Sequence, residues 1–211
     1  MPLDMVSSDA IGNALAKQKA ANIRDGIPSA EKRIEWLDKS IDLLATHADA
    51  LTKAMAEDFG HRSVDQSNFT DIGSSIGALK HSRKHVKKWM RPEKRGVEFP
   101  LNMLGSKAYV QFQPKGVVGV ISPWNFPVNL TFAPLANVFA AGNRTMIKPS
   151  EFTEATSELM KELFSKYYTD EEVVVVTGGP DVGATFSQET LDNLIFTGAT
   201  SVAKHVMRAA A

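Results

Sequence analysis

The segment Ser122-Pro-Trp-Asn-Phe-Pro127 concentrates residues that could serve catalysis. Two prolines and two aromatic residues within it make a stiff loop. The side-chain amide of Asn125, at its centre, could donate a hydrogen bond to a developing oxyanion, a contact typically worth about 100- to 1000-fold in rate. The alternative interpretation is an asparagine that only completes a turn.

A second polar cluster lies in Met146-Ile-Lys-Pro-Ser-Glu151. Pro149 ends the preceding strand, so Lys148 stands at its carboxyl edge and Glu151 follows in the loop. A cation and a carboxylate on one short loop could both bind ribose hydroxyls, and the carboxylate would repel a 2′-phosphate, which favours NAD over NADP. From this segment alone, a surface ion pair is an equally good interpretation.

The segment Gly178-Gly-Pro-Asp-Val-Gly183 resembles a nucleotide-binding fingerprint, but it lacks the spacer that Gly-x-Gly-x-x-Gly requires. A turn that opens a short helix is at least as good an interpretation. Its glycines would still let a phosphate or an adenine ring approach the backbone closely.

These segments fall within an alternation of apolar strands and helices. We predict strands at 116–121, 144–148, 173–177 and 193–197, and helices at 130–141, 155–167 with Thr153 as N-cap, 180–187 and 201–210. Such an alternation predicts an α/β fold with a Rossmann-like, doubly wound parallel sheet covered on both faces. Ligands bind beyond the carboxyl ends of such strands, which here are followed by 121–125, 148–151, 177–183 and 196–202.

The first half of the chain reads as helical. We predict a helix at 7–21, a single long helix from the N-cap Ser29 to a C-cap at Gly60, and another helix at 68–90. Extended segments around a turn at 102–106 predict a β-hairpin over 97–113. The predicted organisation is a helical segment at 1–96, the hairpin at 97–113, and βα units at 114–211.

Composition excludes several classes of function. The 211 residues contain 24 basic and 24 acidic side chains, so no general attraction to nucleic acid is expected, and the basic cluster at 80–95 is read as a solvated helix face. No apolar run approaches the roughly 20 residues of a membrane span, and the first residues show no secretory signal, so we expect a cytoplasmic protein. His81 and His85 lack a third ligand, so we expect no metal site.

Three motifs together resemble the NAD(P)-dependent aldehyde dehydrogenase superfamily. They are Pro-Trp-Asn-Phe-Pro at 123–127, Ala-Gly-Asn-Arg-Thr-Met-Ile-Lys-Pro-Ser-Glu at 141–151 and Ile-Phe-Thr-Gly at 195–198, in the family's order and approximate spacing. The resemblance extends back through 33–37 and 57–62 and so covers nearly the whole chain. Within the superfamily the sequence looks closest to bacterial coniferyl aldehyde dehydrogenases and the related fatty- and aromatic-aldehyde group.

The resemblance implies a role for each matching residue. Asn125 would be the oxyanion-hole asparagine, and Lys148, Ser150 and Glu151 would bind the adenosine ribose of NAD, with NADP as the other possible cofactor. The remaining cofactor contacts would be Gly179, Pro180 and Gly183 on the adenine side, Phe196, Thr197, Gly198 and Val202 along the pyrophosphate path, and Ile121, Ser122, Pro123 and Trp124 near the nicotinamide. Ala199 stands where the family usually has Ser or Asn, which implies weaker cofactor binding.

The family's chemistry also needs a cysteine thiolate and a glutamate, which the resemblance places beyond these residues. The sequence contains no cysteine, and a serine hydroxyl without a neighbouring base is a much weaker nucleophile. We therefore expect a chain truncated before the catalytic domain and inactive on its own. The resemblance also implies that the hairpin forms a homodimer. The alternative is a non-catalytic protein that binds nucleotide or oligomerises through the hairpin.

Overall fold

Four parallel strands form the centre of the structure, a computed structural model that describes residues 8–211. They are β3 (Val117–Ile121), β4 (Arg144–Lys148), β5 (Val173–Val175) and β6 (Asn193–Phe196), arranged in the order β5-β4-β3-β6. The inner strands β3 and β4 are almost wholly buried, as expected for the centre of a parallel sheet covered on both faces. Because β6 returns to the other side of β3, the order of the strands reverses beside β3.

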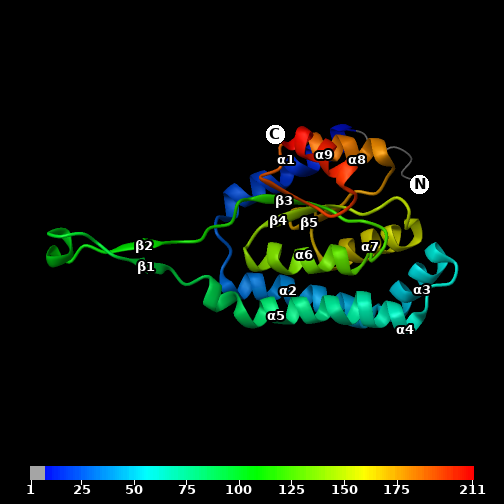
Figure 1. Cartoon of the computed structure of the whole chain (residues 1–211), viewed down its shortest axis with the longest axis horizontal. Coiled ribbons are helices and arrows are strands. Elements are labelled where there is room, and N and C mark those ends of the chain that lie inside the picture. Colours follow the sequence, from blue (N-terminus) through cyan, green and yellow to red (C-terminus); the bar gives the residue numbers. More distant parts are fainter. Residues whose placement is uncertain (1–7) are drawn as a thin grey trace.

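Helices cover both faces of this sheet (Figure 1). α6 (Asn129–Ala140) and α7 (Glu154–Tyr167) lie on one face, and α1 (Ser8–Asp25), α8 (Pro180–Gln188) and α9 (Thr200–Ala210) lie on the other. The predicted α/β fold with a parallel sheet is therefore confirmed, and these elements begin and end within a few residues of the predicted positions.

A further helical layer packs on the outside of α6 and α7. It consists of α2 (Ala30–Thr46), α3 (Ala48–Phe59), α4 (Val64–Ser67), a π-helical turn η1 (Asn68–Gly73) and α5 (Ser74–Trp89). The main core lies between these layers, where Leu37, Leu44, Phe132 and Phe164 are fully buried or nearly so. The first half of the chain therefore supports the two helices that follow β3 and β4.

The single long helix predicted between Ser29 and Gly60 is wrong. The chain breaks at His47, whose φ of −109° and ψ of 19° end α2 and begin α3. Both predicted caps are present: the Ser29 hydroxyl accepts from the Lys32 amide at 3.2 Å, and Gly60 is left-handed with φ of 73°. The spacing of apolar residues continues through the break because α2 and α3 both pack on the α6–α7 layer. The apolar periodicity of the sequence therefore does not reveal the break at His47.

An arm formed by two short antiparallel strands projects away from the helices and the sheet (Figure 1). β1 (Glu93–Arg95) pairs with β2 (Ala108–Val110), and a 3-10 turn η2 (Leu101–Leu104) lies at the tip. The hairpin predicted at 97–113 therefore starts four residues earlier, and 97–99 are not a strand. Pro100, which has no N–H to donate, limits pairing at that point.

The N-terminus of α7 is capped from another part of the chain. Thr153 occupies the predicted N-cap position, but its hydroxyl donates to the carbonyl of Ser150 instead of capping the helix. The carboxylate of Asp58, at the end of α3, accepts from the amides of Ala155 and Thr156, both at 2.9 Å, and from the Thr156 hydroxyl at 2.6 Å. The predicted N-cap position of Thr153 is therefore confirmed, but the side chain that caps the helix is that of Asp58.

Two further expectations concern the whole chain. No helix in residues 8–211 is both long and apolar enough to cross a membrane. The expectation about a secretory signal falls on the first residues, and the predicted helix start at residue 7 falls there too; both lie outside the described residues.

Replacing Asp58 with alanine is expected to lower the free energy of unfolding by roughly 1–3 kcal/mol, because two amides and a hydroxyl lose a charged acceptor. Urea unfolding followed by circular dichroism measures the change. Asp65→Ala is the control, since Asp65 is exposed in the first turn of the short helix α4. Equal effects of the two substitutions would contradict the capping role.

Candidate functional site

The carboxyl ends of three neighbouring strands meet at one edge of the sheet. Ile121 at the end of β3 is paired with Lys148 of β4 on one side and Phe196 of β6 on the other. Backbone bonds continue this alignment into the loops: the Ser122 amide donates to the Lys148 carbonyl at 3.2 Å, and the Thr197 amide to the Ile121 carbonyl at 3.1 Å. The loops that follow β3, β4 and β6 therefore lie side by side along one rim, the carboxyl edge of the sheet. The loop that carries Asn125 lies between the loop that follows Lys148 and the segment that follows Phe196.

Asn125, the central residue of the loop 122–127, is exposed to solvent. Its backbone carbonyl accepts a hydrogen bond from Arg62 at 2.7 Å. Trp124 is half-exposed, and its ring lies 6.2 Å from that of Phe59. Ser122 differs from the expected cofactor contact, because its buried hydroxyl bonds to the Thr131 hydroxyl at 2.7 Å. Asn125 is thus an exposed polar residue of this loop, whereas Ser122 is buried.

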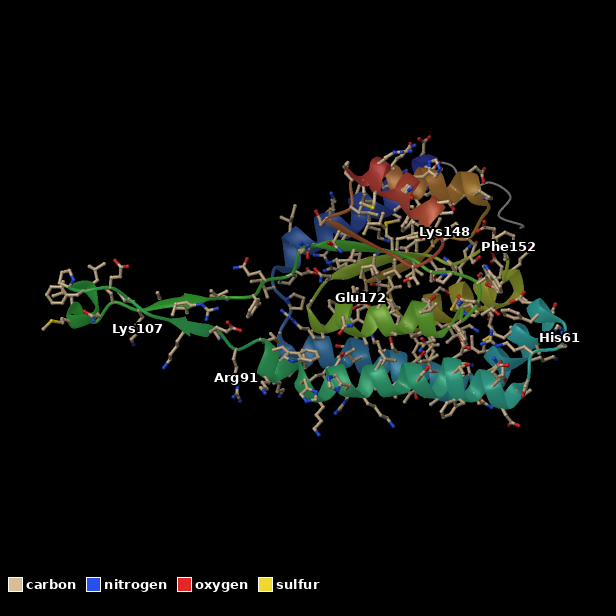
Figure 2. All side chains as sticks on the ribbon, in the orientation of Figure 1. His61, Arg91, Lys107, Lys148, Phe152 and Glu172 are labelled. Atoms are coloured by element: carbon tan, nitrogen blue, oxygen red, sulfur yellow. The ribbon has the colours of Figure 1, made fainter. Side chains whose placement is uncertain are left out.

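The Lys148 loop holds a buried cation next to a carboxylate. The Lys148 ammonium donates to the Pro149 carbonyl at 2.8 Å and lies 3.4 Å from the Glu151 carboxylate. Burial lowers the pKa of Lys148, although the charges of Glu151 and Asp181 oppose this shift. Figure 2 places Lys148 towards the end of the molecule that also carries His61, opposite the arm. The ion pair therefore has one buried and one partly exposed partner, so it is not a fully solvated surface pair.

A cavity of about 290 Å³ adjoins this loop. Its lining includes the predicted Ser150, Glu151 and Gly179. The other lining residues are Pro149 after β4, Glu154, Ser157 and Glu158 at the start of α7, and Thr177 and Gly178 after β5. The volume is at the lower limit for a ligand site and suits a ribose. Glu154, Ser157 and Glu158 were not among the predicted contacts, although they lie in the first turns of a helix that follows a predicted strand.

The glycine segment opens α8, as the turn interpretation predicted. Gly179 is the N-cap residue and Pro180 the first helical residue. Gly178 has a φ of +144°, and a β-carbon there would lie 2.6 Å from Val182, so only glycine fits. A β-carbon on Gly183 would lie 3.9 Å from the Lys148 side chain. The turn therefore brings exposed backbone alongside the Lys148 loop.

The segment after β6 flanks the Asn125 loop from the other side. The Phe196 ring lies over Gly198, where a β-carbon would approach it to 2.6 Å. Thr197 is half-buried, and Val202 on α9 is 49% exposed. None of these residues lines the 290 Å³ cavity, so the predicted contacts form two groups on either side of the Asn125 loop.

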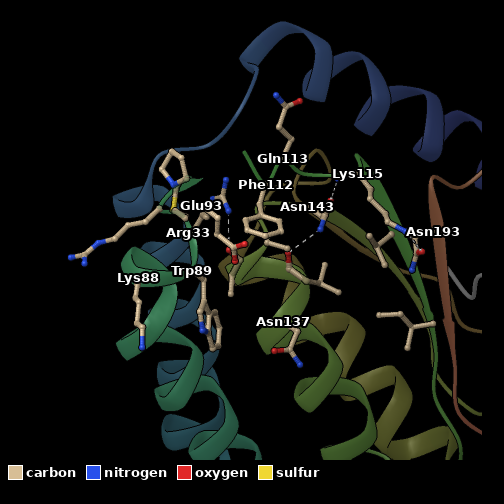
Figure 3. Close-up of a pocket in the computed structure, with 18 residues that line it drawn as sticks. Arg33, Lys88, Trp89, Glu93, Phe112, Gln113, Lys115, Asn137, Asn143 and Asn193 are labelled. Carbon is tan, nitrogen blue, oxygen red and sulfur yellow. Dashed lines mark hydrogen bonds between the residues drawn. The ribbon is translucent and has the colours of Figure 1, made fainter. Parts of the chain in front are cut away.

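A larger cavity of about 850 Å³ lies elsewhere (Figure 3). In its lining, Lys115 and Asn143 precede β3 and β4, and Asn193 is the first residue of β6. The cavity therefore opens at the amino ends of the strands and beside the base of the arm. Arg33 in this cavity is bonded to the Ala140 carbonyl at 2.9 Å. No predicted site residue lines this cavity.

Two histidines on α5 show no metal-binding arrangement. The ring of His85 bonds through Nδ1 to the carbonyl of His81, and both rings pack near Trp89. Within residues 8–211, no group of three or more His, Cys, Asp or Glu side chains could hold a metal ion.

A covered parallel sheet with polar loops and a glycine turn at its carboxyl edge defines a dinucleotide-binding type of α/β fold. Comparison with known proteins narrows this class. A profile of the aldehyde dehydrogenase family matches residues 6–211, and the chain belongs to that family.

Two curated relatives are similar over 98% of this chain. A probable coniferyl aldehyde dehydrogenase of Caulobacter vibrioides is 62% identical and is covered over 44% of its length, and a coniferyl aldehyde dehydrogenase of a Pseudomonas species is 50% identical and is covered over 42%. The chain therefore spans less than half the length of these relatives.

Solved structures share the fold. The substrate-bound structure of Staphylococcus aureus AldH superposes with a TM-score of 0.88 at 29% identity, over 95% of this chain and 43% of that one. A structure of PnpE in complex with nicotinamide adenine dinucleotide gives a TM-score of 0.83 at 26% identity, over 96% of this chain and 41% of that one.

Replacing Lys148 with methionine is expected to change the free energy of unfolding by less than about 1 kcal/mol at neutral pH, because burial already penalises the ammonium. The pKa of Lys148 is lower in the folded chain than in the unfolded chain, so the unfolded state binds more protons between the two values. The wild type should therefore gain stability over Lys148→Met as pH rises towards the ordinary lysine pKa. Urea titrations at several pH values measure this; a wild-type advantage that shrinks with pH would contradict it.

Proposed function

We propose that this chain is the cofactor-binding part of an NAD-dependent aldehyde dehydrogenase, which oxidises an aromatic aldehyde such as coniferyl aldehyde, or a long-chain aldehyde, to the carboxylic acid. The single observation that carries the proposal is the shared rim, where Asn125 lies between the Lys148 loop and the Phe196 segment. Family membership and the two coniferyl aldehyde dehydrogenase relatives support it.

The 290 Å³ cavity lined by Ser150 and Glu151 suits the adenosine half of a nicotinamide dinucleotide. The Lys148 ammonium and the Glu151 carboxylate supply a donor and an acceptor for ribose hydroxyls, next to the backbone at Gly179. Glu151, Glu154 and Glu158 together make this cavity acidic, and they would repel the 2′-phosphate of NADP. Bound NAD would supply the hydride acceptor for aldehyde oxidation.

A cavity of about 670 Å³ beside the Asn125 loop suits the aldehyde. Phe126 and Phe69 provide aromatic surface, and Thr70, Ser74 and Asn129 provide polar atoms at its wall. An aromatic aldehyde placed here could direct its carbonyl oxygen towards Asn125. The amide of Asn125 would then stabilise the negative charge that develops on that oxygen when a nucleophile attacks the carbonyl carbon.

The residues present bind and orient the reactants but do not supply the nucleophile. The sequence has no cysteine, and a thiolate is what the proposed attack on the aldehyde requires. The chain by itself is therefore proposed to bind NAD without turnover. This observation also favours the second candidate function, a non-catalytic protein that binds nucleotide.

Calorimetry of the purified chain is expected to show NAD binding that Lys148→Met weakens, and a preference for NAD over NADP of about tenfold that Glu151→Gln reduces. Glu162→Gln is the matched control, because Glu162 is exposed on α7 and pairs with Lys166 outside the cavity. Mixing the chain with NAD and coniferyl aldehyde should yield no NADH. Absence of NAD binding would refute the cofactor site, and sustained NADH production would refute the requirement for a cysteine.

We also propose that the arm mediates formation of a homodimer. Phe99, Met103 and Leu104 near its tip are each at least 76% exposed, and Tyr109 and Phe112 add further apolar surface along it. Such a concentration of exposed apolar side chains indicates a contact surface. Each of the two short strands also leaves one edge free to pair with another chain.

A chain carrying both Met103→Asp and Leu104→Asp is expected to elute as a monomer under conditions where the wild type elutes as a dimer or larger, because charged residues would be buried in the contact. Size-exclusion chromatography with light scattering measures the mass. Lys107→Gln serves as the control on the same arm. A monomeric wild type at tens of micromolar would contradict the proposal.

A further inference from the structure

One buried ion pair fastens the loop that carries Asn125, at the centre of the loop and at its carboxyl end. Arg62 follows α3, and Asp71 lies in the π-helical turn η1; their side chains are 6% and 0% exposed. One guanidinium nitrogen of Arg62 donates to the Asn125 carbonyl at 2.7 Å, and the other donates to the Asp71 carboxylate at 2.5 Å. Arg62 therefore connects the loop directly to the outer helical layer.

Asp71 holds the carboxyl end of the same loop. Its second carboxylate oxygen accepts from the amides of Val128 and Asn129 at 3.2 and 3.1 Å, at the first turn of α6. These amides have no acceptor within their own helix, so the carboxylate acts as its cap. The pair thus fixes the chain at residue 125 and again at residues 128 and 129.

Aromatic contacts limit the movement of the guanidinium. Arg62 lies 4.8 Å from the ring centre of Phe59 and 5.2 Å from that of Phe126, which follows Asn125 directly. Cation–π contacts of this kind strengthen when the cation is desolvated, as it is here. A planar guanidinium can contact two rings while donating in two directions, which a lysine ammonium does not reproduce.

We propose that Arg62 and Asp71 are positioning residues that hold the oxyanion donor Asn125 in place before substrate arrives. The inference rests on the function proposed above for Asn125. A donor amide stabilises a transition state only when its position is already fixed, because reordering it during the reaction costs free energy. The Arg62 hydrogen bond to the Asn125 carbonyl fixes the backbone from which the exposed Asn125 side chain projects.

Local mobility of the loop tests the proposal without any cofactor. Arg62→Met is expected to raise the hydrogen-exchange rates of the Val128 and Asn129 amides about tenfold or more, because the carboxylate that accepts from them loses its charge partner. In a Trp89→Phe background, acrylamide quenching of Trp124 should also increase, since Trp36 is buried and does not contribute.

Arg144→Met is the matched control. Arg144 is also a buried arginine, 7% exposed, that donates to one carbonyl, of Glu171, and to one carboxylate, of Asp25, but at the amino end of β4. It should destabilise the chain to a similar extent and leave exchange at Val128 and Asn129 unchanged. If the methionine variants do not fold, Arg62→Lys and Arg144→Lys carry the same comparison, with exchange raised about threefold or more by Arg62→Lys alone.

Each outcome has a distinct meaning. Unchanged exchange and quenching in Arg62→Met, or equal changes in the Arg144 variant, would overturn the positioning role, because the loop would then be held by the general stability of the fold. NAD binding is measured separately on the same samples. A wild-type chain that fails to bind NAD would refute the cofactor site, whereas the exchange data would still decide whether Arg62 and Asp71 hold the loop.

Discussion

The structure depends on the backbone register of three neighbouring parallel strands. Ile121 is paired in register with both Lys148 and Phe196, so β3, β4 and β6 end side by side at the same edge of the sheet. Hydrogen bonds between adjacent backbones set this register, and continuous burial of β3 and β4 prevents a slip. Asn125, Lys148 and Glu151 all lie within a few residues of the carboxyl ends of these strands.

The outer helical layer fixes the two loops that follow the central strands. Asp58 caps α7, which follows the Lys148 loop, and Asp71 caps α6, which follows the Asn125 loop. In both cases a carboxylate from the first half of the chain satisfies amides that a helix leaves unpaired and interacts favourably with its dipole. The helices of the first half therefore position the rim as well as bury the core.

Much of the fold was predictable because its signals are local. Continuous β-branched strands and the alternation with helices predicted the parallel sheet, and Ser29 and Gly60 marked helix ends through their own conformations. The break at His47 was not predictable, since two helices packed on one layer keep the same apolar spacing. The paired part of the arm was also misplaced, because register between two exposed strands leaves no pattern of burial in the sequence.

The candidate site divides in the same way. The sequence by itself determined which residues have the required chemistry and, through the order of strands and loops, that Asn125, Lys148 and Glu151 belong to the carboxyl edge. Only the tertiary structure decided their partners. Arg62 bonds to the Asn125 carbonyl, and Asp71 caps α6. Glu154 and Glu158 line the 290 Å³ cavity together with Glu151. The physical reason is that a side-chain hydrogen bond acts over about 3 Å, while Arg62 and Asn125 are 63 residues apart along the chain, so packing must first bring them together.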